Sequence, residues 1–202
     1  MCQIKSGIVL KDKIFCPLDY DSHEDMIKEL KLDDTTMNPN FVRVEIIPKD
    51  NNVFNHNLDN WQFKVDQDLI PKWFDKEEAE VLMKKELQKW FKERFIFGKK
   101  DSINRGRWFL GGSAQVKYIY GSAQVKYIYG SAQVKYICGS AQVENICGSA
   151  QVENIGDRAI CCFTGKNAKY KTIKDNAMAV LYYKANPEIV VANPKIKLVV
   201  NK

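Results

Sequence analysis

Alanine recurs every nine residues through the second half of this 202-residue chain. The first five of these alanines lie in near-identical copies of a Gly-Ser-Ala-Gln-Val-x-x-Ile-x nonapeptide, and the last three lie in degenerate copies. A fixed short period predicts one small structural unit that stacks on itself, and it therefore constrains the architecture of this half of the chain. The eight alanines are Ala114, Ala123, Ala132, Ala141, Ala150, Ala159, Ala168 and Ala177.

The variable positions of the nonapeptide indicate which side chains face solvent. Among the five clean copies, one position changes from Lys to Glu, one from Tyr to Asn, and one from Tyr to Cys or Gly. A position that accepts either charge must be exposed, because an unpaired buried charge is very costly. The constant Ala, Val and Ile are therefore predicted to point inward, and each Gly-Ser supplies a corner.

Each nonapeptide is thus expected to form one strand and one turn. A coil of two nonapeptides gives a flattened roll with two sheets, whereas a coil of three gives a prism with three. The small alanine favours a thin interior and hence the two-sheeted roll. The β-branched Val and Ile and the regular Gly argue against an amphipathic helix. We predict a β-solenoid, either a parallel β-roll or a β-helix, that begins at Gly111 or Gly112.

The first hundred residues predict an α+β domain. Alternating apolar residues indicate strands over 41–47 and 61–65 and a hairpin within 4–15. Helices are expected over 22–32 and over 75–95, the latter with an N-capping aspartate and an acidic first turn. Residues 98–108 are expected to be a polar connection. The fold class is therefore an α+β N-terminal domain followed by a β-solenoid of nonapeptide repeats.

Three regions follow from this division. Residues 1–100 are the expected α+β head, and residues 101–183 are the expected solenoid. Residues 184–202 contain two Asn-Pro pairs that break the period, and proline cannot donate to a β-ladder. This last region is predicted to cap the solenoid or to provide an edge for self-association.

The net charge of +6 is concentrated in the second half. Residues 1–100 hold 17 Lys and Arg against 19 Asp and Glu, whereas residues 101–202 hold 14 against 6. Such a surface can bind an acidic protein or nucleic acid, although a solvated basic surface is the simpler interpretation. We expect a host protein or nucleoprotein as partner, with direct nucleic-acid binding and homo-oligomerisation left open.

Two candidate binding faces carry the exposed lysines. A stripe of lysine and tyrosine on the repeats could hold phosphate and stack bases, unless tandem duplication merely copied exposed residues. The first face is Lys117, Tyr118, Lys126, Tyr127, Lys135 and Tyr136, and the second face is Lys166, Lys169, Lys171 and Lys174.

Motifs for catalysis, metals and cofactors are missing from the sequence. The six cysteines show no CxxC spacing, so neither zinc nor disulfides are expected. The Gly-Ser turns lack the aspartates that bind calcium in other nonapeptide rolls. An enzyme in the head would depend on His23, Asp66 and Asp68, but a helix cap and a surface histidine explain the segment around His23 better. No catalytic residue, metal ligand or cofactor is predicted.

Several segments resemble those of a largely uncharacterised family of phage, prophage and commensal-bacterial proteins. The resemblance is carried by residues 13–26, by Val65-Asp66-Gln67-Asp68 and by the Gly-Ser-Ala-Gln-Val-x-x-Ile-Cys units. It implies an N-terminal α+β domain followed by a variable number of nine-residue Ala-x-Val-x-x-Ile repeats. A mobile-element origin would be compatible with a small inhibitor of host defence, such as an anti-CRISPR-like protein.

We therefore expect a non-enzymatic interaction protein that binds and inhibits a host protein or nucleoprotein. A self-assembling scaffold is the first alternative, and an enzyme in the head is the second. The chain has no run of about 18 apolar residues and no secretory signal at its start, so a cytoplasmic location without membrane contact is expected.

Overall fold

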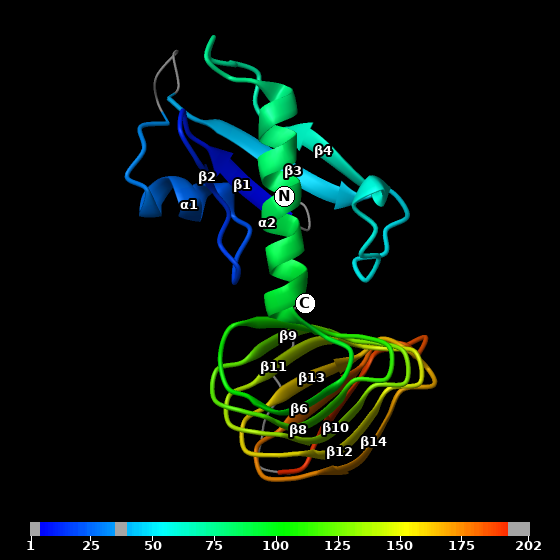
Figure 1. Ribbon diagram of the computed structural model, residues 1–202. Helices are drawn as coiled ribbons and strands as arrows, with labels where there is room; N and C mark the ends of the chain where they lie inside the picture. The colour runs from blue at the N-terminus through cyan, green and yellow to red at the C-terminus, as the bar shows by residue number, and fades with distance from the viewer. Residues whose placement is uncertain (1–4, 35–39, 194–202) are drawn as a thin grey trace. The chain divides into compact units, whose positions relative to one another are not determined.

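The computed structural model describes residues 5–34 and 40–193 (Figure 1). The chain divides into two compact units, Met1–Glu93 and Arg94–Lys202. Each unit is built around its own sheets. In the described ranges, no helix is both long and apolar enough to cross a membrane.

The N-terminal unit is a four-stranded antiparallel sheet with a helix on each face. Its strands lie in the order β2-β1-β3-β4. Ile8 of β1 packs with Met26 and Ile27 of helix α1, whereas the adjacent Gly7 faces Met83 of helix α2. Neighbouring strand residues point to opposite faces, so the two helices cover opposite sides of the sheet. The elements are β1 (Lys5–Val9), β2 (Ile14–Phe15), α1 (His23–Glu29), β3 (Val42–Pro48), η1 (Leu58–Asn60), β4 (Trp61–Val65) and α2 (Lys76–Arg94).

The elements predicted for this unit are confirmed with small changes at their ends. The hairpin is present, with Ile8 opposite Phe15. The Ser22 hydroxyl caps α1 by accepting from the Asp25 N–H. The Asp75 carboxylate accepts hydrogen bonds from the first backbone N–H groups of α2, at 2.9 and 3.0 Å. Capping side chains satisfy N–H groups that lack an intrahelical partner, which explains why the sequence predicts both helix starts.

His56 stacks on Phe91 of α2, with ring centroids 4.1 Å apart. Burial lowers the pKa of His56 below its ordinary value, which is about 6.5 in an unfolded chain. The unfolded chain therefore gains this proton first on acidification, and stability falls as the pH drops through about 6.5 towards the lower folded pKa. His56→Gln should flatten this part of the curve of unfolding free energy against pH, measured by urea denaturation. An unchanged slope in the variant would contradict the assignment.

The C-terminal unit is a β-solenoid of parallel strands. One sheet contains the odd-numbered strands from β5 to β15 together with β16, in the order β16-β15-β13-β11-β9-β7-β5. The other contains the even-numbered strands from β6 to β14, in the order β14-β12-β10-β8-β6. Val116 lies beside Val134, and Val134 beside Val152, so equivalent residues are two nonapeptides apart. The predicted two-sheeted roll, with two nonapeptides in each coil, is confirmed. The strands of the clean repeats are β8 (Gln115–Ile119), β9 (Gln124–Ile128), β10 (Gln133–Ile137), β11 (Gln142–Ile146) and β12 (Gln151–Ile155).

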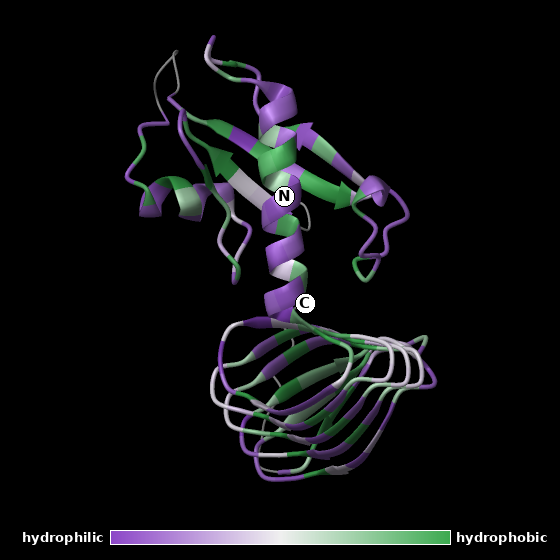
Figure 2. Cartoon of the chain, in the orientation of Figure 1, coloured by the Kyte–Doolittle hydropathy of each residue, from purple (hydrophilic) through white to green (hydrophobic). Residues whose placement is uncertain are grey.

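The interior of the solenoid contains the residues that the repeat predicts. The alanine, valine and isoleucine of the clean copies are at most 2% exposed. Figure 2 shows hydrophobic residues alternating with hydrophilic ones along the coils. Because alanine, valine and isoleucine lie at the same places in every copy, coil stacking brings them together in one continuous apolar core.

The solenoid begins earlier than the repeats predict. Residues 98–108 are not a polar connection, since β5 (Phe95–Ile96), β6 (Lys99–Ile103) and β7 (Arg107–Leu110) form its first coil. Phe95 stacks on Phe109 at 4.6 Å, and Ile103 and Leu110 are buried. Ile96, Ile103 and Leu110 join the apolar interior of the later coils. Gly98 and Gly106 stand where the later coils have alanine, so this coil lacks the alanine signature.

The backbone conformation of the turns explains why glycine begins each clean repeat and why aspartate can replace it in later coils. Gly121 and Gly139 adopt φ values of 63° and 67°, and the equivalent residues of the next coils, Asp157 and Asp175, adopt 55° and 56°. The Asp157 carboxylate accepts from the Gly139 N–H at 2.8 Å. Aspartate tolerates the left-handed region better than most residues because its side chain can hydrogen-bond nearby backbone. The degenerate coils therefore keep the same corner without glycine.

The last coils depart from the repeat. They contain β13 (Ile160–Phe163), β14 (Lys169–Ile173), β15 (Met178–Leu181) and β16 (Glu188–Val191). Strand β16 pairs antiparallel with β15, so it ends the parallel order of its sheet and covers the β15 edge. In the other sheet, β14 is the last strand that the described residues provide. Residues 194–202 of the predicted cap or association segment lie outside the described ranges.

Candidate functional site

Coil stacking aligns exposed side chains in rows across the sheet of even-numbered strands. One row contains Lys99, Gln115, Gln133, Gln151 and Lys169, which are neighbours in the parallel register. In a parallel sheet such neighbours are about 4.8 Å apart. A second exposed row lies two residues further along each strand. Its members are Asp101, Lys117, Lys135, Glu153 and Lys171.

A groove of about 790 Å³ lies along these two rows. Between the rows are the buried valines Val116, Val134 and Val152, followed by Tyr170 on β14. The exposed glutamine amides on one side can both donate and accept hydrogen bonds. The ammonium groups on the other side add charge. The groove thus offers a regular, polar and largely basic surface within one unit of the chain.

The charge of the groove is strongly positive. Six lysines line it, against the carboxylates of Asp101 and Glu153, which leaves a net charge of +4. Several like charges in one groove raise the local potential and attract acidic partners. The lysines are Lys99, Lys100, Lys117, Lys135, Lys169 and Lys171.

The first predicted face is divided between the two sheets. Lys117 and Lys135 lie on β8 and β10 in the groove, whereas Lys126 lies on β9 of the other sheet. There Lys126 forms an ion pair with Glu144 of the adjacent coil. With two strands per coil, successive nonapeptides alternate between sheets. The prediction that these lysines share one face is therefore wrong, while a role in binding stays a prediction.

The tyrosines of the repeat pack against their neighbours. Tyr118 and Tyr136 stack with ring centroids 5.2 Å apart, and the lysines that precede them lie over these rings at 5.2 and 5.7 Å. Tyr127, on the other sheet, stacks against Phe109 at 6.1 Å. These rings support the solenoid surface and the orientation of the lysines.

The second predicted face is also divided. Lys169 and Lys171 lie on β14 and line the groove. Lys166 and Lys174 are exposed in turns on either side of this strand. The structure therefore joins two lysines from each predicted face into one surface. A signal for this grouping is present in the sequence, because a coil of two nonapeptides places positions 117, 135 and 171 in the same row.

The cysteines of the solenoid behave as packing residues. Burial raises the pKa of the Cys138, Cys147 and Cys162 thiols, and Cys161 is fully buried. A raised pKa keeps a thiol protonated at neutral pH and lowers its reactivity. Cys138 and Cys147 occupy the repeat position of Tyr120 and Tyr129, where they serve as packing residues.

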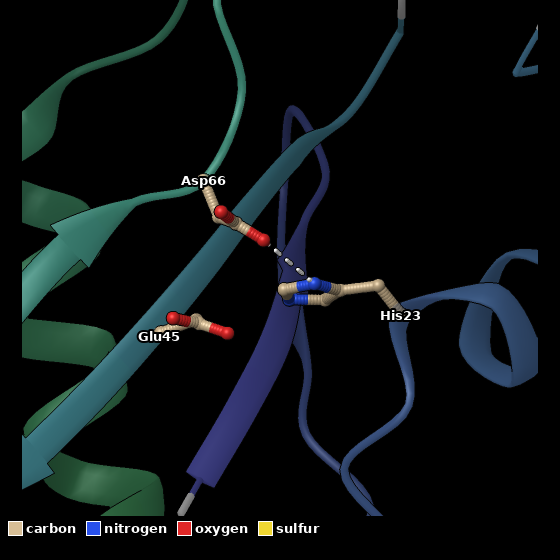
Figure 3. Close-up of side chains that lie close together, drawn as sticks. All are labelled: His23, Glu45 and Asp66. Carbon is tan, nitrogen blue, oxygen red and sulfur yellow. Dashed lines mark ion pairs between the residues drawn. The ribbon is translucent and has the colours of Figure 1, made fainter. Parts of the chain in front are cut away.

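A cluster of His23, Glu45 and Asp66 lies in the N-terminal unit (Figure 3). His23 is 3% exposed, so the prediction of a surface histidine is wrong. Its Nδ1 lies 3.3 Å from an Asp66 carboxylate oxygen. Sequence reasoning singles out His23 and Asp66 but misses Glu45, a buried carboxylate of strand β3. Asp68, the third residue of the enzyme site that the sequence suggests, is exposed and lies outside the cluster.

Comparison with protein-family models, curated proteins and solved structures finds no match to this chain.

Proposed function

We propose that this chain is a binding protein whose solenoid groove docks an acidic surface of a partner protein. The observation that carries this proposal is the basic groove, in which Lys117, Lys135, Lys169 and Lys171 converge from three coils. The parallel register holds their backbones at fixed spacing, so little backbone entropy is lost when a partner binds.

Features of the groove favour a protein partner over nucleic acid. The row of lysines is interrupted by Glu153 and preceded by Asp101, which would repel a uniform run of phosphates. The faces of Tyr118 and Tyr136 already contact each other and the lysines, so they offer little area for base stacking. A protein surface with acidic and amide groups complements this mixture better.

The resemblance to phage and prophage proteins suggests the kind of partner. A protein of that origin would act in the cytoplasm of a host cell, and a small inhibitor of host defence needs a binding surface rather than a catalytic site. We therefore propose a host protein or nucleoprotein of a defence system as the target.

Self-association is the second candidate function. Strand β14 is the last strand of its sheet in the described part of the chain, and an unpaired edge can bind a strand of another molecule. Its exposed Lys169 and Lys171 oppose such pairing through charge repulsion. This feature favours the groove as the binding surface.

An affinity pull-down of the tagged chain from host lysate, with and without nuclease, tests the proposal. We expect a stoichiometric protein that persists after nuclease treatment and is released by salt, since exposed charge pairs are screened. Loss of the partner on nuclease treatment would indicate a nucleoprotein held through nucleic acid. Recovery of the bait alone would favour self-association.

Charge reversal at the groove should weaken this capture. An exposed ion pair contributes about 0.2–1 kcal/mol, and reversal replaces attraction by repulsion of similar size. The triple variant Lys117→Glu, Lys135→Glu, Lys171→Glu is therefore expected to weaken binding by at least about tenfold. Affinity for the captured partner is measured by calorimetry or surface plasmon resonance.

The matched control reverses three lysines outside the groove, namely Lys126, Lys166 and Lys174. It changes the net charge by the same amount and should bind within about twofold of the unmodified chain. Circular dichroism verifies that both variants keep the solenoid. Equal weakening in the two variants would refute the groove and leave only a general charge effect.

A further inference from the structure

The polar cluster of the N-terminal unit combines residues from three elements. His23 is the first residue of α1, Glu45 lies in β3, and Asp66 directly follows β4. One nitrogen or oxygen from each of these side chains lies within 4.8 Å of the other two. Figure 3 shows the imidazole, reached from α1, beside both carboxylates. Imidazole and carboxylate groups are common ligands of transition metals.

The hydrogen bonding of His23 prepares its ring for metal binding. Nε2 lies 3.1 Å from the Val44 carbonyl oxygen. A carbonyl oxygen can only accept, so Nε2 carries the hydrogen and donates it. Nδ1 faces the Asp66 carboxylate, so it is the ring nitrogen placed to bind an ion together with that carboxylate. Metal-bound histidines typically donate their second N–H to a backbone carbonyl or carboxylate, which fixes the tautomer and the ring orientation.

We propose that His23, Glu45 and Asp66 bind a divalent transition-metal ion such as zinc. The cluster supplies one imidazole nitrogen and two carboxylate groups, which are donors that zinc takes in proteins. His23 is 3% and Glu45 6% exposed, so the surrounding protein holds two of the three ligands in place.

The spacing of the cluster is compatible with this ion. Zinc bonds to nitrogen and carboxylate oxygen of about 2.0–2.2 Å place tetrahedral ligand atoms about 3.4 Å apart. The observed limit of 4.8 Å requires only side-chain adjustments. Asp66 is 53% exposed, so an ion can enter from solvent and retain water at a fourth position.

Ser6 provides a second, independent observation. It lies opposite Glu45 in the register of β1 and β3, so both side chains project from the same face of the sheet. Its hydroxyl is buried and has no hydrogen-bond partner within residues 5–34 and 40–193. A hydroxyl beside a metal-binding carboxylate can hydrogen-bond its non-ligating oxygen and hold it in place. The metal site gives this orphaned hydroxyl a role.

Titration of the full, reduced chain with Zn²⁺ in a calorimeter tests the site. We expect one bound ion per chain through this cluster, with Asp66→Asn lowering its affinity at least tenfold. Asp66 is half-exposed, so its substitution leaves the fold intact. The neighbouring Asp68→Asn removes the same charge outside the cluster and should change the affinity less than twofold.

The cysteines require a separate readout, because thiolates also bind zinc. Co²⁺ in place of Zn²⁺ gives thiolate charge-transfer absorption only when sulfur is a ligand, so binding at the cluster should produce visible bands without it. Glu45→Gln provides a second variant that should weaken these bands. The proposal is overturned if no ion binds, if Asp66→Asn and the unmodified chain bind equally, or if the Co²⁺ spectrum shows thiolate ligands. The last two results would place the ion at the cysteines or elsewhere on the surface.

Discussion

Deleting residues 121–129 is expected to keep a folded solenoid and to abolish capture of the partner. The deletion removes one nonapeptide, so every following strand moves to the opposite sheet. There it still pairs with strands of similar sequence, because the nonapeptides resemble one another. The groove then loses Lys135, Lys169, Lys171 and one glutamate, and it gains Glu144. The net charge of the side chains that line the groove therefore falls from +4 to about +1. Circular dichroism and the pull-down together measure the two effects.

The control is a deletion of two nonapeptides, residues 139–156. Because this segment is one whole coil, all remaining strands stay in their original sheets and the groove lysines stay aligned. The deletion also removes Glu153 from the groove, so binding should be kept or strengthened. Each coil contacts only its neighbours, so the control, which loses twice as many residues, should lose about twice as much stability. Equal binding by both deletions would show that the groove is not the binding surface.

Replacing Gly130 by alanine should destabilise the solenoid by about 2–3 kcal/mol. Gly130 has φ +76°, which an L-residue with a Cβ adopts at a cost. An added Cβ would also lie 2.7 Å from the Gly112 carbonyl oxygen of the preceding coil. This close contact is with backbone, which cannot rotate away as a side chain could, so the coils must separate locally. Urea denaturation followed by circular dichroism gives the loss in unfolding free energy.

Gly98→Ala is the matched control for this substitution. A Cβ at Gly98 meets no atom within 4 Å, so the change in unfolding free energy should stay within about 0.5 kcal/mol. Comparable destabilisation by both substitutions would mean that the close approach of turns at Gly112 and Gly130 does not limit coil stacking.

The sequence predicts those parts of the fold that are determined by local sequence. The constant Ala, Val and Ile of the repeat predict the interior because the other positions of the strand accept polar or charged residues and must face solvent. The Asp75 cap and the acidic first turn predict the start of α2 because unsatisfied N–H groups need an acceptor there. The first coil escapes prediction because Gly98 and Gly106 stand where the later coils have alanine, so the nine-residue signature is missing there.

The grouping of residues into the candidate sites depends on the strand topology, which the sequence alone does not reveal. Lysines spaced by nine residues look like one stripe, and only the alternation of strands between sheets separates Lys126 from Lys117 and Lys135. In the N-terminal unit, His23 and Glu45 come together because α1 packs on the sheet beside β3, which the local sequence does not specify. Glu45 does not stand out in the sequence, because Arg43 and Glu45 alternate with apolar residues as on the solvent face of a strand.

The hydrogen bonds between coils also determine how the solenoid would respond to tension. Ladders such as the one between β10 and β12 run along the stack, and each coil contributes two nonapeptides of chain. Pulling on the last coil therefore breaks the hydrogen bonds of one ladder at a time, starting at the end that is pulled, and leaves the other ladders unloaded. Each released coil would lengthen the chain by about 60 Å. A single molecule stretched from its C-terminal end would extend in evenly spaced steps, with smaller forces than a sheet sheared along its strands.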